Sequence, residues 1–174
     1  MKHIKLYEEL KFNEKQYHTY DLLNLVRQKD LNIRGENEMI NMIKSGQINL
    51  NLQDQLSKKT ALQFAIINRY EKVFDELIKS GANLDYQDEN GTTALILSSM
   101  GLTGASSDYF TSMMEKLIKA GADWNIKHHF SVDYSKDFFW YLSKNEEVKS
   151  HILKKYHKQY EIYLTKKNAD KFNL

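Results

Sequence analysis

Histidine is the residue type in this chain best suited to metal binding or proton transfer at neutral pH. His128 and His129 are adjacent, so in an extended segment their side chains point to opposite sides and cannot share one metal ion. His151 and His157 are six residues apart, which places them on nearly opposite faces of a helix. We therefore expect no metal site. Because cysteine is absent, thiolate ligands, disulfides and cysteine nucleophiles are also excluded.

The short motifs associated with catalysis are also absent from the sequence. It contains neither a Gly-x4-Gly-Lys phosphate loop nor a Gly-x-Gly-x-x-Gly dinucleotide motif. Gly101 and Gly104 have the spacing of a nucleic-acid clamp, but that clamp needs flanking strands, so we predict an inserted loop between two helices. Asn90-Gly91-Thr92 fits a glycosylation sequon, and we interpret it as a turn. The expectation is a protein that is not an enzyme and uses no cofactor.

Lysines concentrate in the last part of the chain. Between residues 148 and 174, seven lysines and two acidic residues give a charge of +5, while the rest of the chain sums to −3. Tyr156, Tyr160 and Tyr163 lie among these lysines and could stack on nucleic-acid bases. The alternative is a capping helix whose tyrosines pack on the core, because they share one apolar stripe with Ile152. We favour the capping helix.

The overall composition is that of one domain. The chain has 174 residues, enough for one core, and its 25 basic and 23 acidic residues nearly balance. The N-terminal residues have no apolar core long enough for a signal peptide, and no stretch approaches a membrane-spanning length. We therefore expect a cytoplasmic protein.

The elements that would position any site follow from the stretch around Gly81. Lys79 places a cation on the last turn of an apolar-striped helix, where the helix dipole is negative. Gly81 follows it, where a left-handed residue ends the helix, and residues 88–91 have turn chemistry. Thr93 then caps a new helix. This helix–turn–helix unit cannot bury its apolar face alone, so it predicts stacked neighbours.

The neighbours are present as repeats. The Ile-Lys-x-Gly ending occurs at residues 43–46, 78–81 and 118–121. The Thr-Ala-Leu start occurs at residues 60–62 and 93–95, with a spacing of 33 residues. The glycines of the last two endings are 40 residues apart, which predicts an insertion at residues 101–107.

These motifs and their period resemble the ankyrin-repeat family. The resemblance covers residues 21–156 and is strongest between residues 43 and 125. The chain departs from the family pattern at the start of each first helix. Ala61 and Ala94 replace the usual proline, and Gln63 and Ile96 replace the histidine that normally braces neighbouring turns. Lys58 stands where the next repeat has a glycine, with one extra residue in that turn.

The resemblance implies an all-α solenoid of about four helix pairs with short hairpin-like fingers and a long C-terminal capping helix. We expect one domain over residues 1–174. Its parts are an N-terminal extension (1–20), an N-cap repeat (21–53), a repeat (54–87), a repeat with the inserted loop (88–127), and a degenerate repeat with the C-terminal cap (128–174). The predicted helices outside the two regular repeats are Leu6 to Phe12, Asp21 to Arg27, Glu36 to Ser45, a short aromatic one at Phe138 to Leu142, and Glu146 to Leu164.

The family resemblance also implies a binding function. Ankyrin proteins bind a partner protein through a concave face made by finger tips and first helices. Mapped onto this sequence, the candidate partner-binding residues are Gln55, Leu56, Lys59, Ile67, Asn68, Glu89, Asn90, Thr92, Met100, Leu102, Thr103, His129 and Phe130. Leu56, Ile67, Met100 and Phe130 are the most informative, because apolar side chains directed at solvent suggest a partner. We expect the inserted loop, Leu102 included, to be exposed, and Trp124 to be structural.

The expected mechanism is steric. A monomer would cover and neutralise the working surface of a partner protein, with a few apolar anchors supplying most of the affinity. The lysine- and asparagine-rich, proline-free composition is similar to that encoded by AT-rich bacterial genomes, and small ankyrin proteins of that kind resemble toxin-immunity proteins. The alternatives are an adaptor or effector that engages a host or housekeeping protein, and a nucleic-acid binder that uses the basic C-terminal helix.

Overall fold

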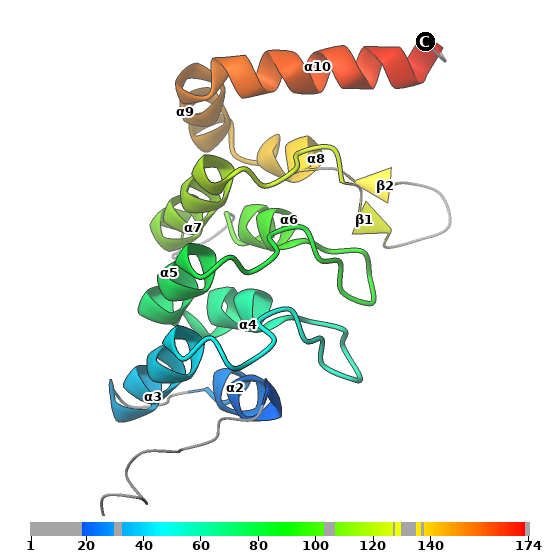
Figure 1. The fold of residues 1–174 in the computed structure, drawn as a ribbon. Helices are drawn as coiled ribbons and strands as arrows, with labels where there is room; N and C mark the ends of the chain where they lie inside the picture. Colours follow the sequence, from blue (N-terminus) through cyan, green and yellow to red (C-terminus); the bar gives the residue numbers. More distant parts are fainter. Residues whose placement is uncertain are drawn as a thin grey trace, which may run out of the picture.

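Helix pairs stacked on one another form a solenoid from which loops project to one side (Figure 1). This computed structural model describes residues 19–29, 33–102, 107–126, 128–129, 135–136 and 138–172. The helix predicted around Leu6 to Phe12 lies outside these residues.

The helices form two layers (Figure 1). The inner layer, next to the projecting fingers, contains α2 (Thr19–Val26), α4 (Ala61–Asn68), α6 (Ala94–Met100) and α8 (Phe138–Leu142). The outer layer contains α3 (Ile33–Lys44), α5 (Glu71–Lys79), α7 (Ser107–Ala120) and α9 (Glu146–Lys155). A last helix, α10 (His157–Phe172), crosses the end of the stack. The predicted all-α solenoid of helix pairs is confirmed.

Threonine caps start the two regular inner helices. The Thr60 hydroxyl accepts the backbone N–H of Gln63, and the Gln63 side chain accepts the Thr60 N–H at 2.9 Å, which makes a reciprocal capping box. Thr93 accepts the N–H of Ile96 in the same way. Gln63 also donates to the carbonyl of Thr92 in the next finger at 2.6 Å. It therefore links neighbouring repeats, which is the role the family usually gives to histidine.

Left-handed glycines follow three of the outer helices, α3, α5 and α7. Gly46, Gly81 and Gly121 have φ of +67°, +83° and +94°, so the predicted positive φ at Gly81 and Gly121 is confirmed. The N–H of Ala82 then bonds the carbonyl of Leu77 at 2.9 Å, which satisfies a helix-end acceptor.

The core lies between the two layers. Residues of the outer-helix stripe are completely buried, among them Val73, Phe74 and Leu77 of α5, and the equivalent residues Met113 and Leu117 of α7. In the described part of the chain, every buried side-chain nitrogen or oxygen has a hydrogen-bond partner. Burial of these apolar stripes against neighbouring repeats contributes most of the folding stability of the stack.

Fingers join α3 to α4, α5 to α6 and α7 to α8. The first closes with a bridge between Gln53 and Thr60, and the third contains a two-stranded hairpin. Strand β1 (His128–His129) pairs antiparallel with β2 (Ser135–Lys136). Lys58 has φ of +54° and Gly91 has φ of +77°, so both take a left-handed conformation at the same place in their fingers.

Two predicted helices differ from those observed. The helix predicted from Glu36 to Ser45 begins three residues earlier, because α3 starts at Ile33. The closing helix predicted from Glu146 to Leu164 is two helices, α9 and α10, separated at Tyr156. The break turns the chain across the end of the stack (Figure 1), and the rings of Tyr160 and Tyr163 on α10 then lie 5.1 and 4.3 Å from the Phe139 ring of α8. The helical conformation also continues to Phe172, beyond the predicted end.

Gly81→Ala should lower the free energy of unfolding by about 1 kcal/mol, because a Cβ is strained at positive φ. No other atom lies within 4 Å of the added Cβ, so the backbone conformation alone sets this cost.

Gly101→Ala should destabilise for a different reason, since its Cβ would lie 2.4 Å from the Phe110 ring. Urea unfolding can separate the two causes: Gly81→Asn should be milder than Gly81→Ala, and Gly101→Asn should be worse than Gly101→Ala. Equal stability of wild type and Gly81→Ala would contradict the assigned helix end.

Gln63→Ala should lower the free energy of unfolding by about 2 kcal/mol, because it removes a cap and leaves the buried Thr92 carbonyl without its donor. The matched control is Gln55→Ala, because Gln55 is exposed in the adjoining finger. We expect no measurable change for the control in the same urea titration. A loss shared equally by both variants would mean that Gln63 does not link the repeats.

Candidate functional site

The candidate site is the surface formed by the projecting fingers and the inner helices beside them (Figure 1). We call it the finger face and define it by six of the predicted residues: Gln55, Leu56, Ile67, Glu89, Asn90 and Met100. They come from the first two fingers and from the C-terminal ends of α4 and α6.

Three apolar side chains on the finger face are directed to solvent. Leu56 is 81% exposed at the tip of the first finger, while Ile67 is 39% exposed and Met100 is 42% exposed. Ile67 and Met100 occupy equivalent positions in successive repeats, one residue before the end of α4 and at the end of α6. A single exposed apolar side chain is ordinary, but three on one face are a candidate set of partner anchors.

Two predicted site residues are buried, and the prediction of their exposure was wrong. Leu102 is 1% exposed: it packs in the core, and its backbone carbonyl accepts a hydrogen bond from the side-chain amide of Asn145 at 3.2 Å. It therefore anchors the end of α6 to the start of α9. Thr92 is 4% exposed, because its finger folds back on the buried carboxylate of Asp88. Neither side chain can reach a partner in this conformation.

Two further predicted residues are engaged within the protein. Lys59 forms an ion pair of 2.8 Å with Asp88 of the next finger, and its side chain is only 18% exposed. The Asn68 side chain donates to the carbonyl of Val26 at 2.7 Å, which ties α4 to α2. Both residues position the finger face and offer a partner little surface.

Three predicted residues lie within or next to segments that the structure does not describe. Thr103 and Phe130 lie outside the described residues. His129 belongs to strand β1, where its backbone pairs with Ser135.

A buried aspartate organises each of the first two fingers. Asp54 accepts the backbone N–H of Ser57 at 2.9 Å, and Asp88 accepts those of Asn90 and Thr92, both at 2.9 Å. The Ser57 N–H holds the pKa of Asp54 below its ordinary value even though burial raises it. Burial also raises the pKa of Asp88, but Lys59 and the two N–H groups outweigh it and lower the pKa.

A pocket of about 300 Å³ lies where the first finger meets α2, at the start of the finger face. Arg27 lines it, pairing with Asp54 at 2.8 Å and lying 5.9 Å from the centre of the Phe64 ring. Sequence reasoning missed Arg27, because α2 has none of the repeat motifs. The signal that could have found it is the finger aspartate itself, which needs a cation when buried.

Two exposed aromatic residues were also missed. Trp140 on α8 is 39% exposed, and the Lys144 ammonium lies 4.5 Å from the centre of its ring. Tyr86 in the second finger is 38% exposed. Aromatic side chains of this kind are enriched among interface anchors, so both extend the set of candidates.

The C-terminal tyrosines are unavailable for stacking on bases. Tyr156 is 7% exposed and Tyr163 is 4% exposed, while Tyr160 is half-buried against the Phe139 ring at 5.1 Å. Lys155 pairs with Glu115 at 2.6 Å. This arrangement favours the capping helix over the nucleic-acid alternative.

Within the described ranges, no three histidine, aspartate or glutamate side chains gather as a metal site would require. In the same part of the chain, no helix is both long and apolar enough to cross a membrane.

A comparison with known protein families matches residues 31–128 to ankyrin repeats, in three copies. The comparison with curated proteins finds no match. The match covers more than half of the chain, and its helix pairs, glycine stops and fingers are those described above. The chain belongs to the ankyrin-repeat family, whose repeats are protein–protein interaction modules.

Lys59→Met should lower the free energy of unfolding at pH 7 by about 2 kcal/mol, because it leaves the buried Asp88 carboxylate without its cation. The stability that a lowered aspartate pKa contributes is present above the unfolded pKa and is lost as pH falls through the folded pKa. The difference between wild type and variant should therefore shrink as the pH falls below about 4. The control is Lys79→Met, because Lys79 is 75% exposed and lies 3.8 Å from Glu76. A pH-independent difference would show that the ion pair is not its cause.

Proposed function

We propose that this protein is a non-catalytic binding module that covers and neutralises a partner protein through the finger face. The observation that carries the proposal is the set of exposed apolar side chains, Leu56, Ile67 and Met100, on one face of the solenoid. Burying them against a partner would supply the central anchors of an interface, while Gln55, Glu89 and Asn90 would form its polar rim.

The rigidity of the finger face supports the proposal. The Lys59–Asp88 ion pair joins the first two fingers, and the backbone N–H of Glu89 donates to the carbonyl of Ser57 at 3.2 Å. Gln53 adds a bond to the carbonyl of Gln87 at 2.9 Å. A face held in place before binding loses little conformational entropy when the partner arrives.

Nearly all of the described residues belong to the repeats or to their cap, which is consistent with an action by coverage alone. We propose that the protein works as a cytoplasmic monomer, and that its partner is an enzyme or toxin whose working surface it masks, as an immunity protein would. An adaptor would instead leave the working surface of its partner free.

Substituting the anchors should separate the finger face from the rest of the surface. After cross-linking and mass spectrometry have identified the partner, Leu56→Asp, Ile67→Asp, Met100→Asp and Phe130→Asp are compared by calorimetry. At least one of them should weaken binding about a hundredfold, because a charge is then buried at an apolar contact. Ile33→Asp is the matched control, since Ile33 is 72% exposed at the start of α3, outside the finger face.

Salt dependence should distinguish this interface from binding through the lysines. A combined Lys154→Gln, Lys155→Gln and Lys158→Gln variant should bind almost as well as wild type, with a weak salt dependence. If that variant loses binding and affinity falls steeply with salt, the nucleic-acid alternative gains support instead. A partner whose activity is unchanged when saturated would contradict masking and favour an adaptor.

A further inference from the structure

The same type of hydrogen bond occurs twice between the bases of successive fingers, by which we mean the short segments 49–51, 83–85 and 123–125 that follow the outer helices. The backbone N–H of Asn83 donates to Oδ1 of Asn51 at 2.7 Å, and that of Asp123 donates to Oδ1 of Asp85 at 2.9 Å. We call each of these bonds a rung. The side chain of each donor residue also closes a local turn by accepting the backbone N–H of the residue two positions later. Asn83 accepts the N–H of Asp85 at 2.8 Å, and Asp123 accepts that of Asn125 at 2.9 Å.

Asn125 stands where a third rung would begin. Asn125 occupies the position in the third finger base that Asn51 and Asp85 occupy in the first two. In all three cases the backbone N–H of this residue donates to the side chain of the residue two positions before it. The side-chain N–H of Asn125 donates to Asp123 at 2.6 Å. Its Oδ1 accepts no hydrogen bond from any residue that the structure describes, because no further finger base follows and α10 crosses here instead.

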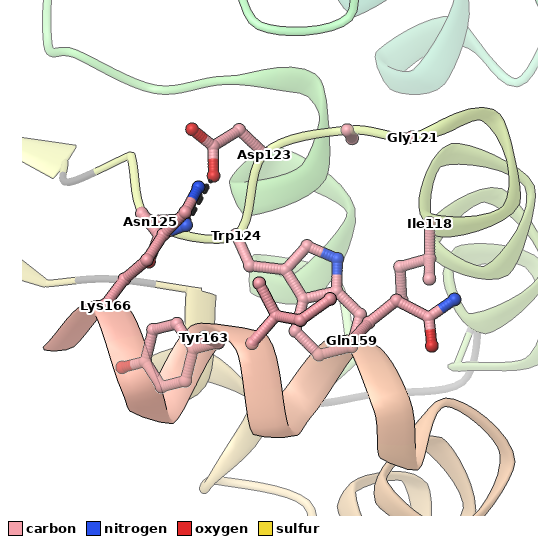
Figure 2. Close-up of a pocket in the computed structure, with 10 residues that line it drawn as sticks. Ile118, Gly121, Asp123, Trp124, Asn125, Gln159, Tyr163 and Lys166 are labelled. Carbon is pink, nitrogen blue, oxygen red and sulfur yellow. Dashed lines mark hydrogen bonds between the residues drawn. The ribbon is translucent and has the colours of Figure 1, made fainter.

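Helix α10 leaves a groove beside Asn125. The groove has a volume of about 260 Å³ and lies between residues 121–125 and one side of α10 (Figure 2). Trp124 and Tyr163 form an apolar wall that is nearly buried, and Ile162 at the edge is 59% exposed. Lys166 lies at the polar end, near Asn125 (Figure 2). The volume is smaller than a drug-sized ligand requires and suits a short extended peptide with one apolar side chain.

We propose that this groove binds an extended segment of a partner protein with the pattern small residue, Asn or Asp, apolar residue. The backbone N–H of the middle residue would donate to Asn125 and complete the third rung. The chain itself shows this occupant twice, as Ala82-Asn83-Leu84 and Ala122-Asp123-Trp124, with both alanines buried. The groove lies against residues 121–125, the segment of the third finger that is equivalent to those joined by the first two rungs. The site uses no residue of the finger face, so it is independent of the proposed function.

The hydrogen bond and the apolar wall determine how tightly a peptide binds, whereas the size of its first residue determines which peptides are accepted. One main-chain hydrogen bond and a shallow apolar wall give weak binding to an isolated peptide, because ordering the peptide costs entropy. The first residue of the pattern is small because the equivalent residues of this chain, Ala82 and Ala122, are 6% and 5% exposed. The same segment on a partner already bound at the finger face would gain from a high effective concentration.

The test uses the full chain and a blocked peptide that copies residues 119–126. Titration of the peptide into isotope-labelled protein should shift the backbone amide resonances of residues 121–125 and of α10. Asn125→Ala should weaken binding about tenfold, whereas Asn125→Asp, which restores the acceptor used at Asp85, should stay within about threefold of wild type. Ile162→Glu should also weaken it about tenfold, and Ile33→Glu, on a different exposed surface, should not.

A second peptide tests the rung itself. It carries N-methyl-aspartate at the middle position, which removes the N–H and keeps the side chain, and it should bind about tenfold more weakly. Equal binding of both peptides, no binding at millimolar peptide, or resonance shifts confined to the finger face would each overturn the proposal. So would self-association of the protein that Asn125→Ala abolishes, because the occupant would then be a second copy of this chain. Circular dichroism of each variant confirms that the fold is intact.

Discussion

Two buried carboxylates, those of Asp54 and Asp88, hold the fingers in place. A finger is too short to bury an apolar core of its own, so its turn depends on a buried acceptor for its backbone N–H groups. Burying a carboxylate is costly without a cation, and in each case that cation comes from the preceding unit, as Arg27 or Lys59. The same interaction thus folds one finger and fixes its position relative to the unit before it.

A second series of polar contacts between side chains runs along the outer layer. Lys116 of α7 reaches Glu71 and Asp75 of α5 at 2.8 Å, and Glu115 meets His151 and Lys155 of α9 at 2.6 Å. Most of these side chains are solvent-exposed, so each pair contributes little stability. Their effect is to align the outer helices, while the buried pairs align the fingers. Both sides of the stack are therefore fixed, which gives the finger face a defined shape for binding.

The end of the stack is closed by aromatic rings instead of another repeat. The Phe139 ring lies 4.3 Å from that of Tyr163 and 5.5 Å from that of Trp124, so α10 is held to α8 and to the third finger base. A terminal unit must cover the apolar face that its missing neighbour would have buried. Rings can do this from a single crossing helix, because each contributes a large apolar area. The helix does not reproduce the backbone of a finger, and the groove beside Asn125 results.

The sequence by itself determined the repeat period, the glycine stops at Gly81 and Gly121, the threonine caps and the layer of buried stripes. These are local properties, set by backbone conformation and helical spacing within a few residues. The tertiary structure decided which predicted site residues are available: Leu56, Ile67 and Met100 remain exposed, while Leu102 and Thr92 are buried and Lys59 is paired. It also decided the break at Tyr156 and the role of Arg27. The physical reason is that burial and pairing depend on segments 27 to 43 residues away, as Arg27 is from Asp54 and Asn145 from Leu102, and no local pattern records those contacts.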